Sequence, residues 1–370
     1  MHPELPFADD LGPARVIHVH QPALGLAGTV VLDNLACGPA IGGLRMAVDV
    51  TTAECARLAR AMTLKNAAAG LPHGGGKSVL RGDPRLPPAD KERLIRAFAA
   101  ALRHEQGYIV GPDMGTDETC MAWVKDEIGR AAGLPTALGG IPLDEIGATG
   151  WGLCHAAEVA LARLGRPLDG ARIAIQGFGA VGRHAARFLT ARGARLVAVG
   201  DSAGAIHQPA GIDLDRLLAI KDGGGKVTAC PGGEIITAEQ LIGVDCDVWI
   251  PAARPDVIHA GNVDRVRAAL LVQGANIPVT PEAERSLHAR GVWVVPDFIA
   301  NAGGVICAAF ELRGATAGAA MAAVEERIRA NTTAVLERAQ AGGVTPRQAA
   351  EALALERVHS AMRTRRWGIY

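Results

Sequence analysis

The sequence predicts an α/β protein that is divided into two domains. At 370 residues the chain is too long for one ordinary hydrophobic core. From Gly150 onward, a helical segment precedes short apolar strands that alternate with helices, as in ARIAIQGFGAVG, ARLVAVGD and VWVVPDF. This alternation is typical of a parallel sheet with helices on both faces. The preceding residues have a different order of elements and are expected to fold separately.

The N-terminal part begins with β-like runs and continues with helical patterns. Strands are expected at 14–20 and 28–32, and a helix from Thr52 to about Ala69 that stops before Gly70 and Pro72. A second helix is expected at 89–104 and a strand at 108–110, and the Ala-, Glu- and Arg-rich tail at 319–366 is read as helices. We therefore expect one α/β domain at 1–143, completed by C-terminal helices at 326–370, and a second domain at 144–325.

The bulk composition excludes several classes of partner. Lys plus Arg and Asp plus Glu number 38 each, so the net charge is zero and no field attracts nucleic acid or an anionic membrane. No apolar run is long enough to span a membrane, and the acidic start MHPELPFADD argues against a signal peptide. Seven scattered cysteines without a C-x-x-C pair favour reduced thiols and a cytoplasmic location.

A glycine-rich segment in the second domain indicates a dinucleotide site. Gly177, Gly179 and Gly182 fit G-x-G-x-x-G between an apolar strand and a helix. In a Rossmann-type domain, this pattern serves a tight turn, close approach to a pyrophosphate, and close helix–strand packing. Asp201 ends the next strand, where an acid binds the adenosine ribose hydroxyls. Its charge favours NAD over NADP, although Arg183 or Arg195 could offset it. A glycine-rich turn without a ligand is the alternative, which the combined strand, helix and acid disfavour.

The sharper signal is a lysine pair in the N-terminal domain. Only six of the 38 basic residues are Lys, and Lys65 and Lys77 lie on either side of an expected glycine-rich turn in MTLKNAAAGLPHGGGKSVL. The P-loop register fails, because Leu71 stands where its first glycine belongs. Oxidation of an amino acid needs a cation for the α-carboxylate, a base for water and a proton shuttle. A lysine of lowered pKa suits the base, and Asp113 in YIVGPDMGT is the natural carboxylate.

The chain resembles the glutamate, leucine, phenylalanine and valine dehydrogenases over nearly its whole length. The ordered segments GPAIGGLRM, MTLKNAAAGLPHGGGKSV, GPDMGT, ATGWG, QGFGAVG, IPAA, QGAN and PDFIANAGGV carry this resemblance. It implies an N-terminal substrate and oligomerisation domain, a Rossmann-type NAD domain, and a homo-oligomer that converts an L-amino acid to a 2-oxo acid and ammonia. It also implies that Lys65 binds the α-carboxylate, that Lys77 is the catalytic lysine and that Asp113 transfers protons.

The same resemblance extends to the residues that line the site. Besides Lys65, the expected substrate-binding residues are Ile41, Gly42, Gly43, Met62, Gly111, Asn301, Val305 and Ala308. The expected cofactor-binding residues are Gly177, Phe178, Gly179, Ala180, Val181, Gly182, Asp201, Ser202, Thr149, Ala252, Ala253 and Asn276. No metal is expected, because His18 and His20 share a strand face but lack a third ligand.

Two positions favour an apolar amino acid as substrate. The glutamate enzymes of the resembled family carry a lysine just before the GG of the substrate loop and a serine four residues beyond the GG of NAGG. Ile41 and Ala308 stand at these positions here. An unpaired buried carboxylate is costly, so a leucine-like to phenylalanine-like substrate is expected. Glutamate is the alternative, because residues 206–231 look closer to the glutamate branch. A regulator that binds nucleotide without turnover is a further alternative, which the complete Lys65, Lys77 and Asp113 set disfavours.

Overall fold

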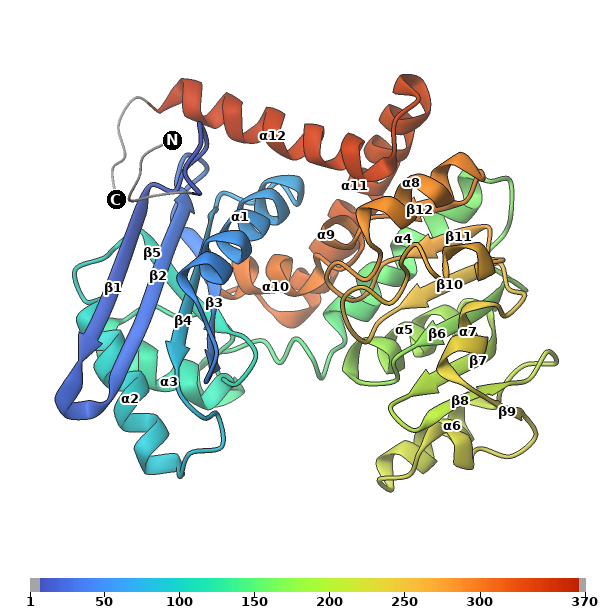
Figure 1. Ribbon diagram of the computed structural model, residues 1–370, viewed down its shortest axis with the longest axis horizontal. Coiled ribbons are helices and arrows are strands. Elements are labelled where there is room, and N and C mark those ends of the chain that lie inside the picture. Colours follow the sequence, from blue (N-terminus) through green and yellow to red (C-terminus); the bar gives the residue numbers. More distant parts are fainter. Residues whose placement is uncertain (1–6, 366–370) are drawn as a thin grey trace. The chain divides into compact units, whose positions relative to one another are not determined.

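The computed structural model describes residues 7–365, which form two compact units. Unit 1 contains the described residues up to Pro142, together with Val305–Ala320 and the residues from Leu353 onward. Unit 2 contains Leu143–Gly304 and Met321–Ala352. Each unit has its own β-sheet, blue to teal in unit 1 and green to orange in unit 2 (Figure 1). The predicted two-domain α/β architecture is confirmed.

Unit 1 is built on a mixed five-stranded sheet. Its strand order is β1-β2-β4-β3-β5, with β1, β2 and β4 antiparallel and β3 parallel to both β4 and β5. β3 therefore lies between β4, which carries Lys77 near its middle, and β5, which leads to Asp113. The strands are β1 (Arg15–Gln21), β2 (Leu26–Asn34), β3 (Ala40–Ala47), β4 (Gly74–Arg81) and β5 (Tyr108–Pro112).

Helices cover both faces of this sheet. Leu94, Phe98 and Met121 of α2 and α3 join the larger buried core, whereas Cys55 and Ala59 of α1 pack on the opposite face. α1 begins where the Thr51 side chain accepts a hydrogen bond from the Glu54 backbone N–H, and the chain leaves it at Gly70, whose φ is +64°. The helices are α1 (Thr52–Ala68), α2 (Pro88–Ala101) and α3 (Glu118–Ile128), with short turns η1 (Pro22–Leu24) and η2 (Thr136–Leu138).

Unit 2 is built on a seven-stranded sheet of Rossmann type. The order is β12-β11-β10-β6-β7-β8-β9, parallel from β12 to β7 and antiparallel at β8 and β9. The parallel strands are almost wholly buried, as expected for a sheet covered on both faces. The strands are β6 (Arg172–Gln176), β7 (Arg195–Asp201), β8 (Gly204–His207), β9 (Glu234–Ile236), β10 (Val248–Pro251), β11 (Leu270–Val272) and β12 (Trp293–Val295).

Helices connect and cover these strands. Capping side chains fix several starts; Asp213 caps α6 and Thr237 forms a capping box with Gln240 at α7. The helices are α4 (Ala148–Arg163), α5 (Ala180–Thr190), α6 (Leu214–Asp222), α7 (Ala238–Ile242), α8 (Pro281–Ala289) and α9 (Asp297–Ala300), with η3 (Val227–Ala229) and η4 (Val263–Arg265). No helix in the described part of the chain is long and apolar enough to cross a membrane.

The C-terminal third is divided between the units differently from the expectation. The sequence assigned 144–325 to the second domain and 326–370 to the first, but α10 (Gly303–Glu311) lies in unit 1 from Val305 onward and 321–352 lie in unit 2. Long-range contacts explain this division. Glu311 binds backbone N–H groups of unit 1, whereas Arg329 in α11 (Ala317–Gly342) and Arg347 in α12 (Pro346–Thr364) pair with Glu158 and Glu284 of unit 2.

Candidate active site

The glycine-rich segment before Lys77 forms the first half of strand β4 and not a turn. Steric contacts explain its glycines. A Cβ added to Gly75 would lie 2.0 Å from the backbone nitrogen of Thr63, so α1 crosses β4 in direct contact. A Cβ on Gly42 of the neighbouring strand would lie 1.6 Å from the Gly76 carbonyl oxygen. The glycines therefore bring α1, which carries Lys65, against the strand that carries Lys77.

Lys77, in the middle of β4, and Asp113, directly after β5, form an ion pair. Lys77 Nζ lies 2.8 Å from Asp113 Oδ1, and the Lys77 side chain is only 6% exposed. Gly43 permits this approach, because a Cβ there would lie 2.7 Å from the Asp113 Cβ. Asp113 Oδ2 lies 2.8 Å from Nε of Arg45, a residue that the sequence interpretation did not include. The two predicted catalytic side chains are thus brought together.

Burial and charge act in opposite directions on this pair. Burial lowers the pKa of Lys77 below its usual value, and although the negative charge of Asp113 opposes this shift, the net change is downward. Burial would raise the pKa of Asp113, but Lys77 and Arg45 outweigh it and hold that pKa below its usual value. The arrangement is an ionised carboxylate beside a lysine that gives up its proton more readily than an exposed lysine does.

Further predicted residues of unit 1 lie on β3, β5 and α1, close in the fold to Lys77 and Asp113. Ile41, 4% exposed, precedes Gly42 and Gly43 in β3, and the half-buried Met62 and Lys65 lie in α1. Gly111 in β5 has room beside it, since a Cβ there would meet nothing closer than 4.0 Å. The space at Gly111 is consistent with a substrate side chain next to β3 and β5.

Val305 and Ala308 lie on α10, which Glu311 anchors to unit 1. The buried Glu311 carboxylate accepts hydrogen bonds from the backbone N–H groups of Gly133 at 2.8 Å and Leu134 at 3.2 Å through Oε1, and from Ile141 at 2.8 Å through Oε2. One side chain thereby binds backbone from two segments of a long loop. The position of α10, and with it that of Val305 and Ala308, therefore depends on Glu311 at the end of the same helix.

The glycine fingerprint of unit 2 has the geometry that each glycine was predicted to serve. Gly177 has φ +97°, and a Cβ on Gly182 would lie 2.0 Å from the Gly177 carbonyl oxygen. At Gly179 a Cβ would meet nothing within 4 Å, so the backbone is open to a ligand. Gly179 is the N-cap of α5 and supplies no capping side chain, which leaves Ala180, Val181 and Gly182 at a helix N-terminus suited to phosphate. Phe178, 3% exposed, packs inward.

Comparison with known proteins identifies the family. Residues 13–130 match the Glu/Leu/Phe/Val dehydrogenase dimerisation domain, and residues 139–366 match Glutamate/Leucine/Phenylalanine/Valine dehydrogenase. The chain belongs to this family. It is a member of a family of amino-acid dehydrogenases that use a nicotinamide dinucleotide.

Several glutamate dehydrogenases are similar to this dehydrogenase. The glutamate dehydrogenase of Thermotoga maritima is 43% identical over 77% of this chain and 71% of its own. The NADP(+)-dependent enzyme of Pyrobaculum calidifontis is 38% identical and the NAD-specific enzyme of Staphylococcus aureus 35%, each over 96% of this chain and 92% of its own. The hetero-hexameric glutamate dehydrogenase of Thermus thermophilus, solved in a leucine-bound form, superposes with a TM-score of 0.84 at 34% identity, over 97% of this chain and 91% of its own.

Several of the predicted cofactor-binding residues lie at the carboxyl ends of β6, β10 and β11. A Cβ on Gly177 would lie 2.8 Å from both Ala252 and Ala253, and Asn301 Nδ2 donates to the Gly274 carbonyl at 3.3 Å and to Asn276 Oδ1 at 3.1 Å. Thr149, near the start of α4, lies beside Gly304. These predicted residues therefore come together in unit 2.

Unpartnered polar atoms there fit a dinucleotide. The buried Oε1 of Gln176 and Oδ1 of Asn301 accept no hydrogen bond within the described chain. Each is an acceptor that a hydroxyl or amide of a bound dinucleotide would satisfy. Together with the open backbone at Gly179, these acceptors fit a dinucleotide, which Asn301 and Gln176 would help to hold.

Asp201 is placed at the end of β7 as predicted, but its carboxylate is already bound by the protein. Oδ2 lies 2.8 Å from Lys221 Nζ and accepts the Val227 N–H at 3.0 Å, and Oδ1 accepts the Ala203 N–H at 2.9 Å. Burial would raise the pKa of Asp201, but Lys221 and the backbone donors outweigh it and lower that pKa. Ser202 beside it is exposed. The charge that argued for NAD is thus offset by a lysine.

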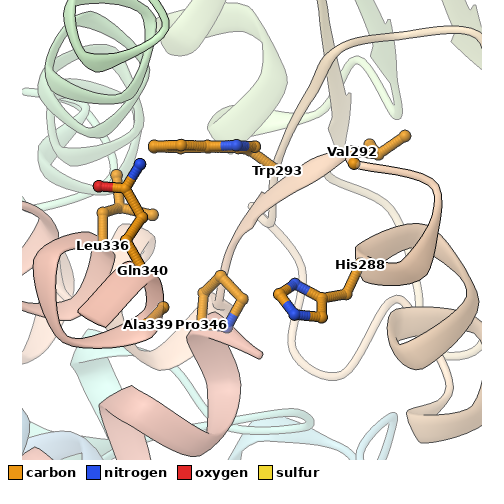
Figure 2. A pocket seen from close by; sticks show the side chains of 8 residues that line it. His288, Val292, Trp293, Leu336, Ala339, Gln340 and Pro346 are labelled. Atoms are coloured by element: carbon orange, nitrogen blue, oxygen red, sulfur yellow. The ribbon is translucent and has the colours of Figure 1, made fainter. Parts of the chain in front are cut away.

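A separate apolar pocket of about 120 Å³ lies on unit 2 (Figure 2). The side chains of Trp293, Leu336, Ala339 and Pro346 surround it, with His288 and Gln340 as its polar groups. No lysine, arginine or carboxylate lines it, so it offers no fixed charge to the α-carboxylate or ammonium of an amino acid. None of its residues belongs to the predicted site. Residues 7–365 contain no group of three side chains placed to hold a metal ion.

Three residues that position the site were missed by the sequence interpretation. Arg45 binds Asp113, Glu311 anchors α10, and Lys221 binds Asp201. Arg45 lies inside the GPAIGGLRM segment and Lys221 is one of only six lysines, so both carried a signal that was not used. Glu311 carried none, because its partners are up to 178 residues away.

Proposed function

We propose that the protein oxidises an L-amino acid to its 2-oxo acid and ammonia, with water as co-reactant and a nicotinamide dinucleotide as acceptor. The observation that carries this proposal is the Lys77–Asp113 pair, in which a buried lysine of lowered pKa lies 2.8 Å from an ionised carboxylate. The bound coenzyme supplies the acceptor for the hydride that leaves the substrate Cα. The side chains of this chain bind the substrate and manage its protons.

Each side chain has a distinct role in the proposed reaction. Lys65 pairs with the α-carboxylate through charge. Neutral Lys77 takes a proton from the water that attacks the iminium carbon of the substrate, forming the C–O bond of a carbinolamine. The ionised Asp113 takes a proton from the substrate ammonium group before hydride transfer and returns it to the nitrogen of the carbinolamine. The C–N bond then breaks to release ammonia, while the carbinolamine hydroxyl passes its proton to the again ionised Asp113 and becomes the carbonyl of the 2-oxo acid. The buried contact between Lys77 and Asp113 holds the two proton-transferring groups next to each other.

Glutamate is the substrate that the relatives support better. The relatives described above are glutamate dehydrogenases, and the similarity extends over most of the chain. A specific observation favours the second candidate, an apolar amino acid: the substrate loop presents the apolar Ile41 directly before Gly42. Ala308 on α10 likewise offers no polar group. A site without a cation would leave the second carboxylate of glutamate unpaired.

NAD and NADP both remain candidates for the coenzyme. Asp201 favours NAD, because a carboxylate repels the 2′-phosphate of NADP. Lys221 at 2.8 Å offsets this repulsion, and relatives of either specificity exist. We also propose a homo-oligomer, on the support of the matched dimerisation domain.

The proposal is tested by following NADH and NADPH oxidation with ammonia and a panel of 2-oxo acids. The panel holds 2-oxoglutarate, 4-methyl-2-oxopentanoate, 3-methyl-2-oxobutanoate, phenylpyruvate and indolepyruvate. Turnover of 2-oxoglutarate alone assigns glutamate, and turnover of the apolar acids alone assigns the second candidate. Absence of turnover with every acid and both coenzymes contradicts the proposed reaction.

A further inference from the structure

Arg45 occupies a central place beside the proposed catalytic pair. It lies on β3, between β4 with Lys77 and β5, which leads to Asp113. In register it is opposite Val79, two residues beyond Lys77. A side chain at this position reaches the Asp113 carboxylate at the end of the neighbouring strand β5.

Arg45 and Lys77 divide the two oxygens of the Asp113 carboxylate. Arg45 Nε lies 2.8 Å from Oδ2, and Lys77 Nζ lies 2.8 Å from Oδ1. The carboxylate cannot rotate about its terminal bond without losing both contacts. The orientation of Oδ1 toward Lys77 therefore depends on the contact that Arg45 makes with Oδ2.

Glu54 holds Arg45 from the other side. Arg45 Nη1 lies 2.6 Å from Oε1 of Glu54, which is in the first turn of α1. The Arg45 side chain is 20% exposed and that of Glu54 28%, so this end of the chain of contacts is partly open to solvent. The ion pairs form a chain from Glu54 through Arg45 and Asp113 to Lys77, in which negative and positive side chains alternate.

We infer that Arg45 is a positioning residue for the proposed reaction, which holds one oxygen of Asp113 so that the other faces Lys77. The inference rests on the proposed function. Arg45 does not touch the reacting atoms; it acts through Asp113 and through its positive charge near Lys77. That charge disfavours protonation of Lys77, and it stabilises Asp113 as the anion.

The pH profile of kcat/KM for oxidative deamination separates this role from a structural one. In Arg45→Met, loss of the cation moves the limb that reports deprotonation of Lys77 to higher pH, by about 0.5–1 pH unit. Arg45→Lys keeps a cation and is expected to retain a profile between those of Arg45→Met and the wild type. Arg57→Met, an exposed arginine of the same helix as Glu54, is the matched control and is expected to leave the profile unchanged.

A second readout does not depend on turnover. With only six lysines in the chain, lysine labelled with ¹³C at Cε gives few signals, and Lys77→Ala assigns that of Lys77. The signal is expected to titrate at higher pH in Arg45→Met than in the wild type. A lower midpoint in Arg45→Met shows that Asp113 has turned away from Lys77, which also supports the inference. The same titration midpoint in both proteins overturns the inference, whether or not the enzyme is active. The wild type can also turn over no oxo acid while the midpoint is still raised in Arg45→Met. This result supports the effect of Arg45 on Lys77 and contradicts the proposed function.

Discussion

Lys77 lies in β4 and Asp113 directly follows β5 in unit 1, and Lys77 Nζ is 2.8 Å from Asp113 Oδ1. The strand order brings the two side chains together, because β4 and β5 both pair in parallel with β3, which lies between them. Gly43 is needed as well, because any side chain there would collide with Asp113. The proposed chemistry follows from this pair, and the predictions test it and its surroundings.

Lys77→Ala is expected to lower kcat by about 10²–10⁴-fold, because it removes the proposed base while leaving unit 2 intact. Binding of NADH, measured by fluorescence titration, is expected to persist. Lys125→Ala, an exposed lysine on α3, is the control and is expected to retain both properties. Turnover within twofold of wild type in Lys77→Ala rules out this role for Lys77.

The pH dependence of oxidative deamination is expected to report the lowered pKa of Lys77. Water activation needs neutral Lys77, so kcat/KM rises with pH and levels off below the usual lysine value of 10.5. Asp113→Asn removes a negative charge that favours protonated Lys77, so the limb is expected to move to lower pH by about 1 pH unit, with a loss of kcat. Asp126→Asn, whose side chain is 71% exposed, serves as control. A limb that moves upward in Asp113→Asn contradicts the assigned pair.

Ile41→Lys is expected to raise kcat/KM for 2-oxoglutarate relative to 4-methyl-2-oxopentanoate by about 10–100-fold. The substitution places a cation before Gly42, where a second carboxylate gains a partner. Ile41→Leu keeps the size and apolarity and is expected to leave the ratio near that of the wild type. An unchanged ratio in Ile41→Lys shows that residue 41 does not face the substrate side chain.

Glu311→Ala is expected to destabilise the protein by about 2–4 kcal/mol, because three buried backbone N–H groups lose their acceptor. Glu311→Gln keeps one carbonyl acceptor, so its stability is expected to lie between those of Glu311→Ala and the wild type. Urea unfolding measures the change, with the exposed Glu326→Ala on α11 as control. Because Val305 and Ala308 lie on the same helix, KM for the oxo acid is expected to rise in parallel. Glu311→Ala with the unfolding midpoint of wild type contradicts the anchoring role.

Lys221→Met is expected to raise the preference for NAD over NADP by about tenfold, because Asp201 then keeps an uncompensated charge. The ratio of kcat/KM for the two coenzymes measures this preference. Lys91→Met on α2 of unit 1 is the matched control. A shift toward NADP in Lys221→Met shows that Lys221 does not act by neutralising Asp201.

The sequence predicted the parts of the site whose residue types are rare or sterically constrained. Lys65 and Lys77 stand out in a chain that mostly uses Arg, and Gly177 and Gly182 of the fingerprint occupy positions that reject a Cβ. Ion pairs across the fold could not be predicted in the same way. Arg45 is one of 32 arginines, and only strand order shows that it binds Asp113. The predicted division of the C-terminal helices between the domains was wrong for the same reason. Arg347 and Glu311 bind partners that are distant in sequence, and these contacts determine the unit to which each helix belongs.

The most direct test of the central claim is oxidation of NADH or NADPH with ammonia and the panel of 2-oxo acids, in wild type and Lys77→Ala side by side. The account predicts turnover of at least one oxo acid by the wild type and its loss in the variant, with coenzyme binding retained in both. A wild type that binds coenzyme but turns over no oxo acid, or a Lys77→Ala protein as active as the wild type, would contradict it.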